Sequence, residues 1–188
     1  MPYDRKPPPA GAGAVPEAEL AAGPKAVPEA ELAAGPEAVS EELVAGAEAV
    51  ARAAHAGQRD KAGRPYAEHL AAVAAGVRTR GGDAALVAAA WLHDALEDGV
   101  LSEEWLRQAP FPQRTKDVVR ALTKRHGEDL EAYARRILAT PGARLVKTAD
   151  IAHNADPRRL AALDEPTARR LALKYATMRA HLGLTAAD

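Results

Sequence analysis

The chain has 188 residues, a formal net charge of −1 and no cysteine. Its length is typical of a single domain with room for an appendage. The lack of cysteine excludes disulfides and thiolate metal sites, so any metal would be bound by His, Asp or Glu. The sequence has no run of about 18 apolar residues and no signal peptide, and we therefore expect a cytoplasmic protein with no membrane partner.

Charge is unevenly distributed along the chain. Residues 1–50 carry nine acidic and three basic side chains, whereas residues 51–188 carry 17 acidic and 22 basic ones. The basic body is compatible with an anionic substrate, but its excess charge is too small and diffuse to indicate nucleic-acid binding. We therefore expect a small-molecule ligand and no nucleic acid, and the oligomeric state is left open.

The N-terminal region contains a repeat. The segment over residues 14–25 recurs over residues 26–37 and differs only at its last position. Each copy contains two Pro and one Gly, which interrupt helices and strands, and its Ala-rich apolar content buries little area. We expect residues 1–39 to form a disordered Pro/Ala/Glu extension, with a partner-binding or spacer repeat as the alternative, and residues 40–188 to form the folded domain.

From Ser40 onward the sequence shows helical periodicity. Ser40 followed by two acidic residues is a typical helix N-cap and predicts a helix to about residue 56. Further periodic apolar segments predict helices over residues 66–79, 83–98, 102–108, 112–124, 128–139, 143–154 and 165–182. No segment alternates with a period of two, so the expected fold class is all-α, with seven to nine helices.

The run His93-Asp94-Ala95-Leu96-Glu97-Asp98 ends an apolar stretch over residues 84–92. If the helix continues through this run, its four polar side chains fall within an arc of about 140° on one face. Burying such groups without partners costs several kcal/mol, and a cation or substrate would compensate for it. His and carboxylate side chains are suitable ligands for divalent ions. The alternative is a solvent-facing helix end with ordinary charges.

Two other segments carry polar groups among apolar ones. His69 lies one turn into a predicted helix and, taken alone, is more typical of a core or surface histidine than of a metal ligand. Lys147, Asp150 and Asn154 share one face of the helix predicted over residues 143–154. A buried Asp150 needs a partner, which is either Lys147 in a structural ion pair or a cation.

Taken in order, these segments resemble the HD-domain metal-dependent phosphohydrolases, most closely the hydrolase domain of the RelA/SpoT family and the small stand-alone alarmone hydrolases. The matching stretches are His55–Gln58, Gly63–His69, Ala90–Asp98, Leu122–Lys124 and Val146–Asn154. The resemblance covers about residues 42–182. It implies an HD-domain helical bundle and hydrolysis of (p)ppGpp, with GDP or GTP and pyrophosphate as products.

The resemblance also implies a site. One divalent ion, typically Mn²⁺, would be bound by His69, His93, Asp94 and Asp150. Glu97 and Asp98 match the catalytic acidic pair, which would position or deprotonate the attacking water beside the ion. The substrate-binding residues would be Arg59, Lys61, Tyr66 and Asn154.

The chain differs from the alarmone hydrolases at two substrate-reading positions. Lys61 matches their usual lysine, but Asp60 occupies the place of an arginine that stacks on guanine, and the neighbouring Arg59 is a candidate to replace it. Pro157 stands where the family commonly has a threonine. The alternatives are therefore an HD phosphatase for another nucleotide or phosphorylated metabolite, and a nucleotide sensor without turnover. Retention of the acidic pair argues against the sensor.

Overall fold

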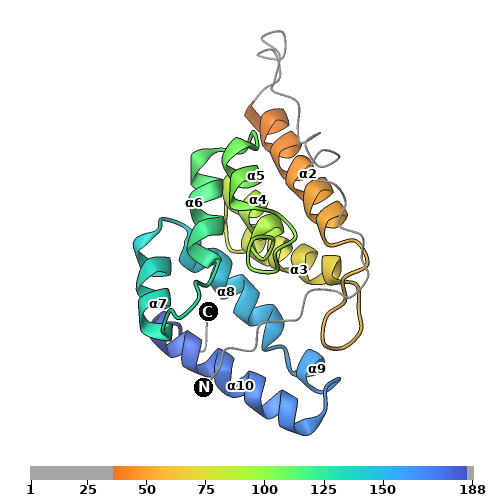
Figure 1. Cartoon of the computed structure of the whole chain (residues 1–188), viewed down its shortest axis with the longest axis vertical. Helices are drawn as coiled ribbons and strands as arrows, with labels where there is room; N and C mark the ends of the chain where they lie inside the picture. Colours follow the sequence, from red (N-terminus) through yellow and green to blue (C-terminus); the bar gives the residue numbers. More distant parts are fainter. Residues whose placement is uncertain (1–35, 186–188) are drawn as a thin grey trace.

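The computed structural model describes residues 36–185 and has nine helices and no strand within that range (Figure 1). The helices are α2 (Pro36–Ala54), α3 (Tyr66–Thr79), α4 (Ala84–Leu92), α5 (Glu103–Gln108), α6 (Gln113–Leu122), α7 (Leu130–Ala139), α8 (Ala143–Asn154), α9 (Pro157–Leu160) and α10 (Glu165–His181). The expected all-α fold is confirmed for the described part of the chain. None of its helices is both long and apolar enough to cross a membrane.

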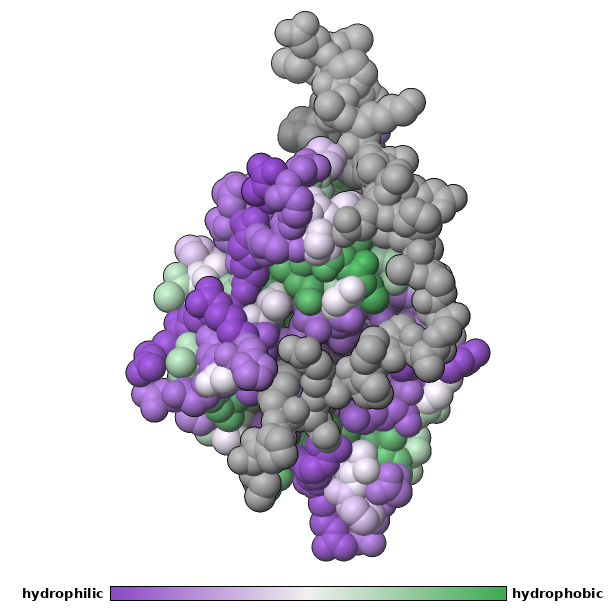
Figure 2. All heavy atoms as spheres, viewed as in Figure 1, coloured by the Kyte–Doolittle hydropathy of each residue, from purple (hydrophilic) through white to green (hydrophobic). Residues whose placement is uncertain are grey.

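Helix α4 is the centre of the core. Its sequence is apolar all round, and every residue from Leu86 to Leu92 is buried. A helix without a polar face must be covered on all sides, and α4 packs against α2, α3, α6 and α8. Figure 1 shows α8 below α4 and α6, and α10 crossing beneath α8. In Figure 2 hydrophilic residues make up most of the coloured surface, and hydrophobic ones are visible in patches between them.

Local sequence signals set where several helices begin. The side chain of Asp83 accepts a hydrogen bond from the Leu86 backbone at the start of α4, and Ser102 caps α5 in the same way. Gly142 has a φ of 89° immediately before α8, a conformation that favours glycine. A Cβ at Gly142 would also collide with Leu86. Glycine thus lets the chain pass close over α4 as α8 begins.

The helix expected over residues 83–98 is shorter than predicted. α4 ends at Leu92, and residues 93–99 form successive turns instead. The His93 ring bonds to the Ala90 carbonyl at 2.8 Å, and the Ala95 backbone N–H turns back to Leu92. The chain thus leaves the α-helical pattern at the point where apolar residues give way to polar ones. The 140° arc of a continuous helix is therefore wrong as a description of this run.

The start of the folded region also differs from the expectation. α2 begins at Pro36, four residues before the predicted cap at Ser40, so residues 36–39 extend that helix. The rest of the expected extension, residues 1–35 with nearly all of the repeat, lies outside the described residues. Its disorder stays a prediction.

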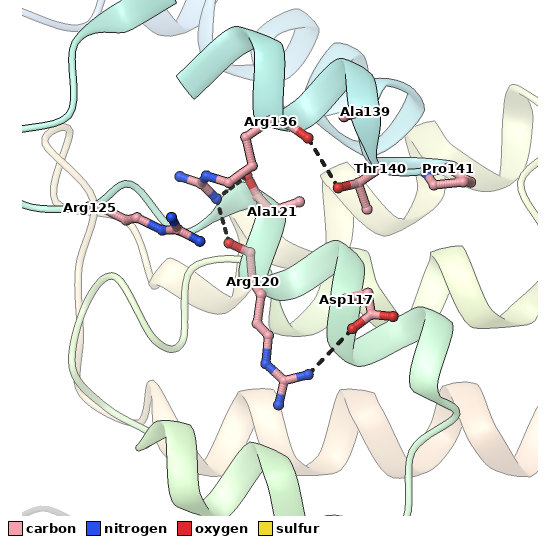
Figure 3. Close-up of a pocket in the computed structure, with 8 residues that line it drawn as sticks. All are labelled: Asp117, Arg120, Ala121, Arg125, Arg136, Ala139, Thr140 and Pro141. Carbon is pink, nitrogen blue, oxygen red and sulfur yellow. Dashed lines mark hydrogen bonds and ion pairs between the residues drawn. The ribbon is translucent and has the colours of Figure 1, made fainter. Parts of the chain in front are cut away.

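Hydrogen bonds from Arg136 connect α7 to the end of α6, beside a surface pocket of about 340 Å³ (Figure 3). Its guanidinium donates to the carbonyl oxygens of Arg120, Ala121 and Thr123 at 2.6–2.9 Å. It also pairs with Glu128 at 2.6 Å, and both side chains are at most 15% exposed. These bonds occupy the guanidinium with backbone carbonyls and a carboxylate, so its role here is structural.

We predict that Arg136→Ala lowers the free energy of unfolding by about 3 kcal/mol, because it leaves Glu128 and three helix-end carbonyls without their partner. Urea denaturation would measure the loss. Arg135→Ala is the matched control, because Arg135 is 68% exposed and forms only a surface pair with Glu131; we expect a change below about 0.5 kcal/mol. Equal losses for the two variants would contradict the structural role.

Candidate metal centre

Four polar side chains from three parts of the fold meet at one point. His69 comes from α3, His93 and Asp94 from the end of α4 and the turn after it, and Asp150 from α8. His93 Nε2 lies 3.1 Å from Asp94 Oδ2 and 3.8 Å from Asp150 Oδ1. His69 Nε2 lies 3.5 and 3.4 Å from the same two oxygens. Atoms that share one ion at about 2.1 Å lie about 3.0–3.5 Å apart, so this spacing suits a common cation.

Three of these residues form a buried group suited to a metal ion by themselves. Suitable ligand atoms of His69, His93 and Asp150 all lie within 4.8 Å of one another. Buried His93 Nε2 has no hydrogen-bond partner. Because Nδ1 of the same ring is bonded to the Ala90 carbonyl, the Nε2 lone pair is directed at the cluster, as in metal-binding histidines. An unsatisfied buried nitrogen beside two carboxylates fits a cation.

The pKa shifts of His93, Asp94 and Asp150 also indicate that positive charge is favoured at this point. Burial lowers the pKa of His93, but Asp94 and Asp150 outweigh it and raise that pKa well above its ordinary value. Burial raises the pKa of Asp94 and of Asp150, yet the pKa of each lies below its usual range, because His93 acts on Asp94 and Lys147 on Asp150. Both carboxylates therefore remain ionised in a largely buried site, and a cation among them satisfies both.

The two oxygens of Asp150 have different partners. Lys147 Nζ donates to Oδ2 at 2.8 Å, whereas Asn154 Nδ2 donates to Oδ1 at 2.6 Å. Oδ1 is also the oxygen that faces the histidines of α3 and α4. The two alternatives for Asp150 are therefore compatible: Lys147 forms the ion pair through one oxygen, and the other oxygen remains directed at the cluster.

Tyr66 acts on the cluster through Asp94. Its hydroxyl donates a hydrogen bond to Asp94 Oδ2. Burial, followed by the charge of Asp94, raises the pKa of Tyr66 well above 10, so the hydroxyl stays protonated and remains a donor. The structure thus connects Tyr66, expected to bind substrate, directly to Asp94.

The expected acidic pair, Glu97 and Asp98, lies beside the cluster, and each carboxylate is held by a different partner. Glu97 Oε2 accepts a hydrogen bond from the Lys124 backbone at 3.0 Å. Asp98 Oδ2 accepts one from Gln58 Nε2 at 2.6 Å, and the other end of the Gln58 amide lies 2.5 Å from His55 Nδ1. Buried His55 therefore orients Asp98 through Gln58. These contacts keep both carboxylates in fixed positions.

Of the side chains named above for this centre, all except His55, Gln58 and His93 line a cavity of about 900 Å³. Ligand pockets commonly enclose about 300–1,000 Å³, so a nucleotide fits this volume. Lys61, Tyr66 and Asn154 line the cavity as expected. Arg59 does not line it: the side chain is exposed and donates to the Gly63 carbonyl at 2.7 Å. The backbone is extended here, where Arg59 bridges to Pro65, and adjacent side chains then face opposite ways.

The HD domain family model matches residues 47–181, which is most of the chain. The chain belongs to the HD domain family. Among curated proteins it is 38% identical over 129 residues to a probable guanosine-3′,5′-bis(diphosphate) 3′-pyrophosphohydrolase of Synechocystis, covering 63% of this chain and 17% of that protein. It is 35% identical over 134 residues to a guanosine-3′,5′-bis(diphosphate) 3′-pyrophosphohydrolase of Haemophilus influenzae, covering 65% and 19%. The chain thus spans less than a fifth of either relative.

One further residue of this HD domain, His153, had no role assigned from the sequence. Its Nδ1 lies 2.8 Å from Nδ1 of His69, and the two rings stack at 5.0 Å. Burial and the neighbouring charge of His69 lower the pKa of His153 to about 4, so the ring is neutral and can accept the His69 proton. That bond leaves the Nε2 lone pair of His69 directed at the cluster.

We predict that His153→Ala weakens Mn²⁺ binding by about 10- to 100-fold, because His69 loses the partner that fixes its tautomer and ring orientation. Isothermal titration calorimetry with Mn²⁺ would measure the change. His181→Ala, at the exposed end of α10, is the control and should bind Mn²⁺ as the unmodified protein does. Unchanged affinity in His153→Ala would show that His69 needs no such support.

Proposed function

We propose that this HD domain is a metal-dependent phosphohydrolase that removes the 3′-pyrophosphate of (p)ppGpp and releases GDP or GTP and pyrophosphate. The observation that carries the proposal is the convergence of two histidines and two carboxylates beside a nucleotide-sized cavity, which all of them except His93 line. Two relatives that match about two thirds of the chain are named for this activity, which supports this choice of substrate.

In this proposal His69, His93, Asp94 and Asp150 hold one divalent ion, with Mn²⁺ as the expected metal. A bound divalent ion supplies the Lewis acidity that polarises a phosphoryl oxygen and activates water. The residues around the ion orient its ligands. Tyr66 and Asn154 hold the two carboxylates in place, since each donates to an oxygen that faces the histidines.

Glu97 and Asp98 are the groups proposed to act on the attacking water. Both line the cavity beside the metal-centre residues. The Lys124 backbone and Gln58 fix their orientation, so either carboxylate can hold the water in line and accept its proton as the phosphate ester breaks. Lys61, at the same cavity, adds positive charge that favours a polyphosphate.

The substrate is tested by incubating the protein with Mn²⁺ and a panel of nucleotides that includes ppGpp, followed by product identification. We expect ppGpp to yield GDP and pyrophosphate. Release of orthophosphate, or turnover only of other phosphorylated metabolites, would contradict the proposed substrate and favour the second candidate, an HD phosphatase of different specificity. Asp60 at the cavity wall is the observation in favour of that candidate.

We predict that Glu97→Gln keeps Mn²⁺ affinity but lowers kcat by about 10²- to 10⁴-fold, because an amide cannot accept the proton of water. By contrast, His93→Ala should lose both metal binding and turnover. Calorimetry with Mn²⁺ and steady-state kinetics separate these outcomes. Glu131→Gln, which changes a carboxylate that is 69% exposed, is the control. An undiminished kcat in Glu97→Gln would remove that residue from the mechanism.

A further inference from the structure

An ion pair between Asp60 and Arg159 forms part of the cavity wall. Arg159 Nη2 lies 3.0 Å from Asp60 Oδ2, and the two side chains are only 16% and 6% exposed. Both residues line the cavity of the metal centre. The pair connects the loop between α2 and α3 with the short helix α9, so two distant parts of the chain meet at this wall.

Hydrogen bonds within its own loop hold the Asp60 side chain in place, in addition to its ion pair with Arg159. Its Oδ1 accepts hydrogen bonds from the backbones of Ala62 and Arg64, both at 2.9 Å. Burial raises the pKa of Asp60, but these bonds and the charge of Arg159 outweigh it, and the pKa lies below its ordinary value. The carboxylate is therefore a rigid anion that holds the guanidinium in one place.

The start of α9 sets the position of Arg159. Asp156 caps this short helix, and Pro157 occupies its first turn, where the fixed φ of proline suits a helix start. In the resulting register Arg158 is exposed, whereas Arg159 reaches the cavity. The two positions at which the sequence differs from the alarmone hydrolases, Asp60 and Pro157, thus both contribute to the placement of one guanidinium.

The surroundings of Arg159 suit a planar heterocycle better than a phosphate. Asp60 already compensates its charge, which reduces the attraction for an anion. Ala62, Leu160 and Leu163 add apolar lining from the same two segments of the chain. A guanidinium held in this way still offers a flat face, and arginine stacks well on aromatic rings.

We infer that Arg159 is the residue that binds the nucleobase in this cavity, by stacking its Asp60-held guanidinium on the ring. The inference rests on the proposed function in requiring a nucleotide as the ligand, although it does not require that ppGpp be the nucleotide hydrolysed. Arg159 on α9 thereby takes the place that Arg59, which faces solvent, does not fill.

The test compares the binding of GDP and of inorganic pyrophosphate, a ligand without a base, by calorimetry in the presence of Mn²⁺. We expect Arg159→Ala to weaken GDP binding by about tenfold and to leave pyrophosphate binding within about twofold. Arg159→Lys keeps a cation for Asp60 but lacks the planar face, so it should lose nearly as much GDP affinity. Arg158→Ala, at the exposed neighbour, is the matched control.

Two other outcomes are possible for Arg159→Ala. An equal loss for both ligands would assign Arg159 to phosphate, and no loss for either would leave it a purely structural role; both results overturn the inference. Unchanged Mn²⁺ affinity and thermal unfolding would show that a variant is folded, and if Arg159→Ala does not fold, Arg159→Lys makes the same comparison.

The same measurements distinguish this inference from the proposed function. Arg159-dependent GDP binding by a protein that does not hydrolyse ppGpp would uphold the inference and reject the substrate. Hydrolysis of ppGpp with a KM that Arg159→Ala leaves unchanged would uphold the function and reject the inference. A protein that binds pyrophosphate but not GDP also rejects the inference, and one that binds neither rejects both.

Discussion

The carboxylates of Asp94 and Asp150 approach the same two imidazole nitrogens, one from the turn after α4 and the other from α8. Lys147 compensates one oxygen of Asp150, and the two carboxylates raise the pKa of His93 well above its ordinary value, so they favour positive charge at this point in surroundings that solvate them poorly. The neighbouring hydrogen bonds, from Tyr66 and Asn154 above all, each orient a side chain around this point. A divalent cation is the compensation that the arrangement suits best.

The fold supplies this arrangement through the composition of α4. A helix that is apolar on every side has no face on which to carry ligands, so the polar run must follow the helix instead of continuing it. The turns over residues 93–99 bring Asp94, Glu97 and Asp98 to the wall of one cavity, while His93 remains buried at the helix end. Gly142 lets α8 begin close against the same core, which places Asp150 opposite them.

Periodicity and capping residues were enough to predict the all-α class and most helix positions, because those signals are local. The site residues came from motifs, and the structure places all of them except Arg59 at the metal centre or its cavity. Three features depend on contacts that a sequence does not display. They are the end of α4 at Leu92, the outward direction of Arg59, and the contact of His153 with His69 across two helices.

The candidate metal centre and the part of the cavity wall formed by Asp60 and Arg159 differ in how closely they pack against the core. The ligand residues lie on or beside α3, α4 and α8, which pack together in the core, and a change there would disturb the fold as well as the chemistry. Asp60 and Arg159 lie on a loop and a one-turn helix that pack less against that core, so their identities can change while the ligand positions stay fixed. A sequence that keeps the four candidate ligand positions yet differs at Asp60 and Pro157 is therefore physically consistent: under the proposed function the reaction type depends on the core, and binding of the nucleobase depends on one ion pair.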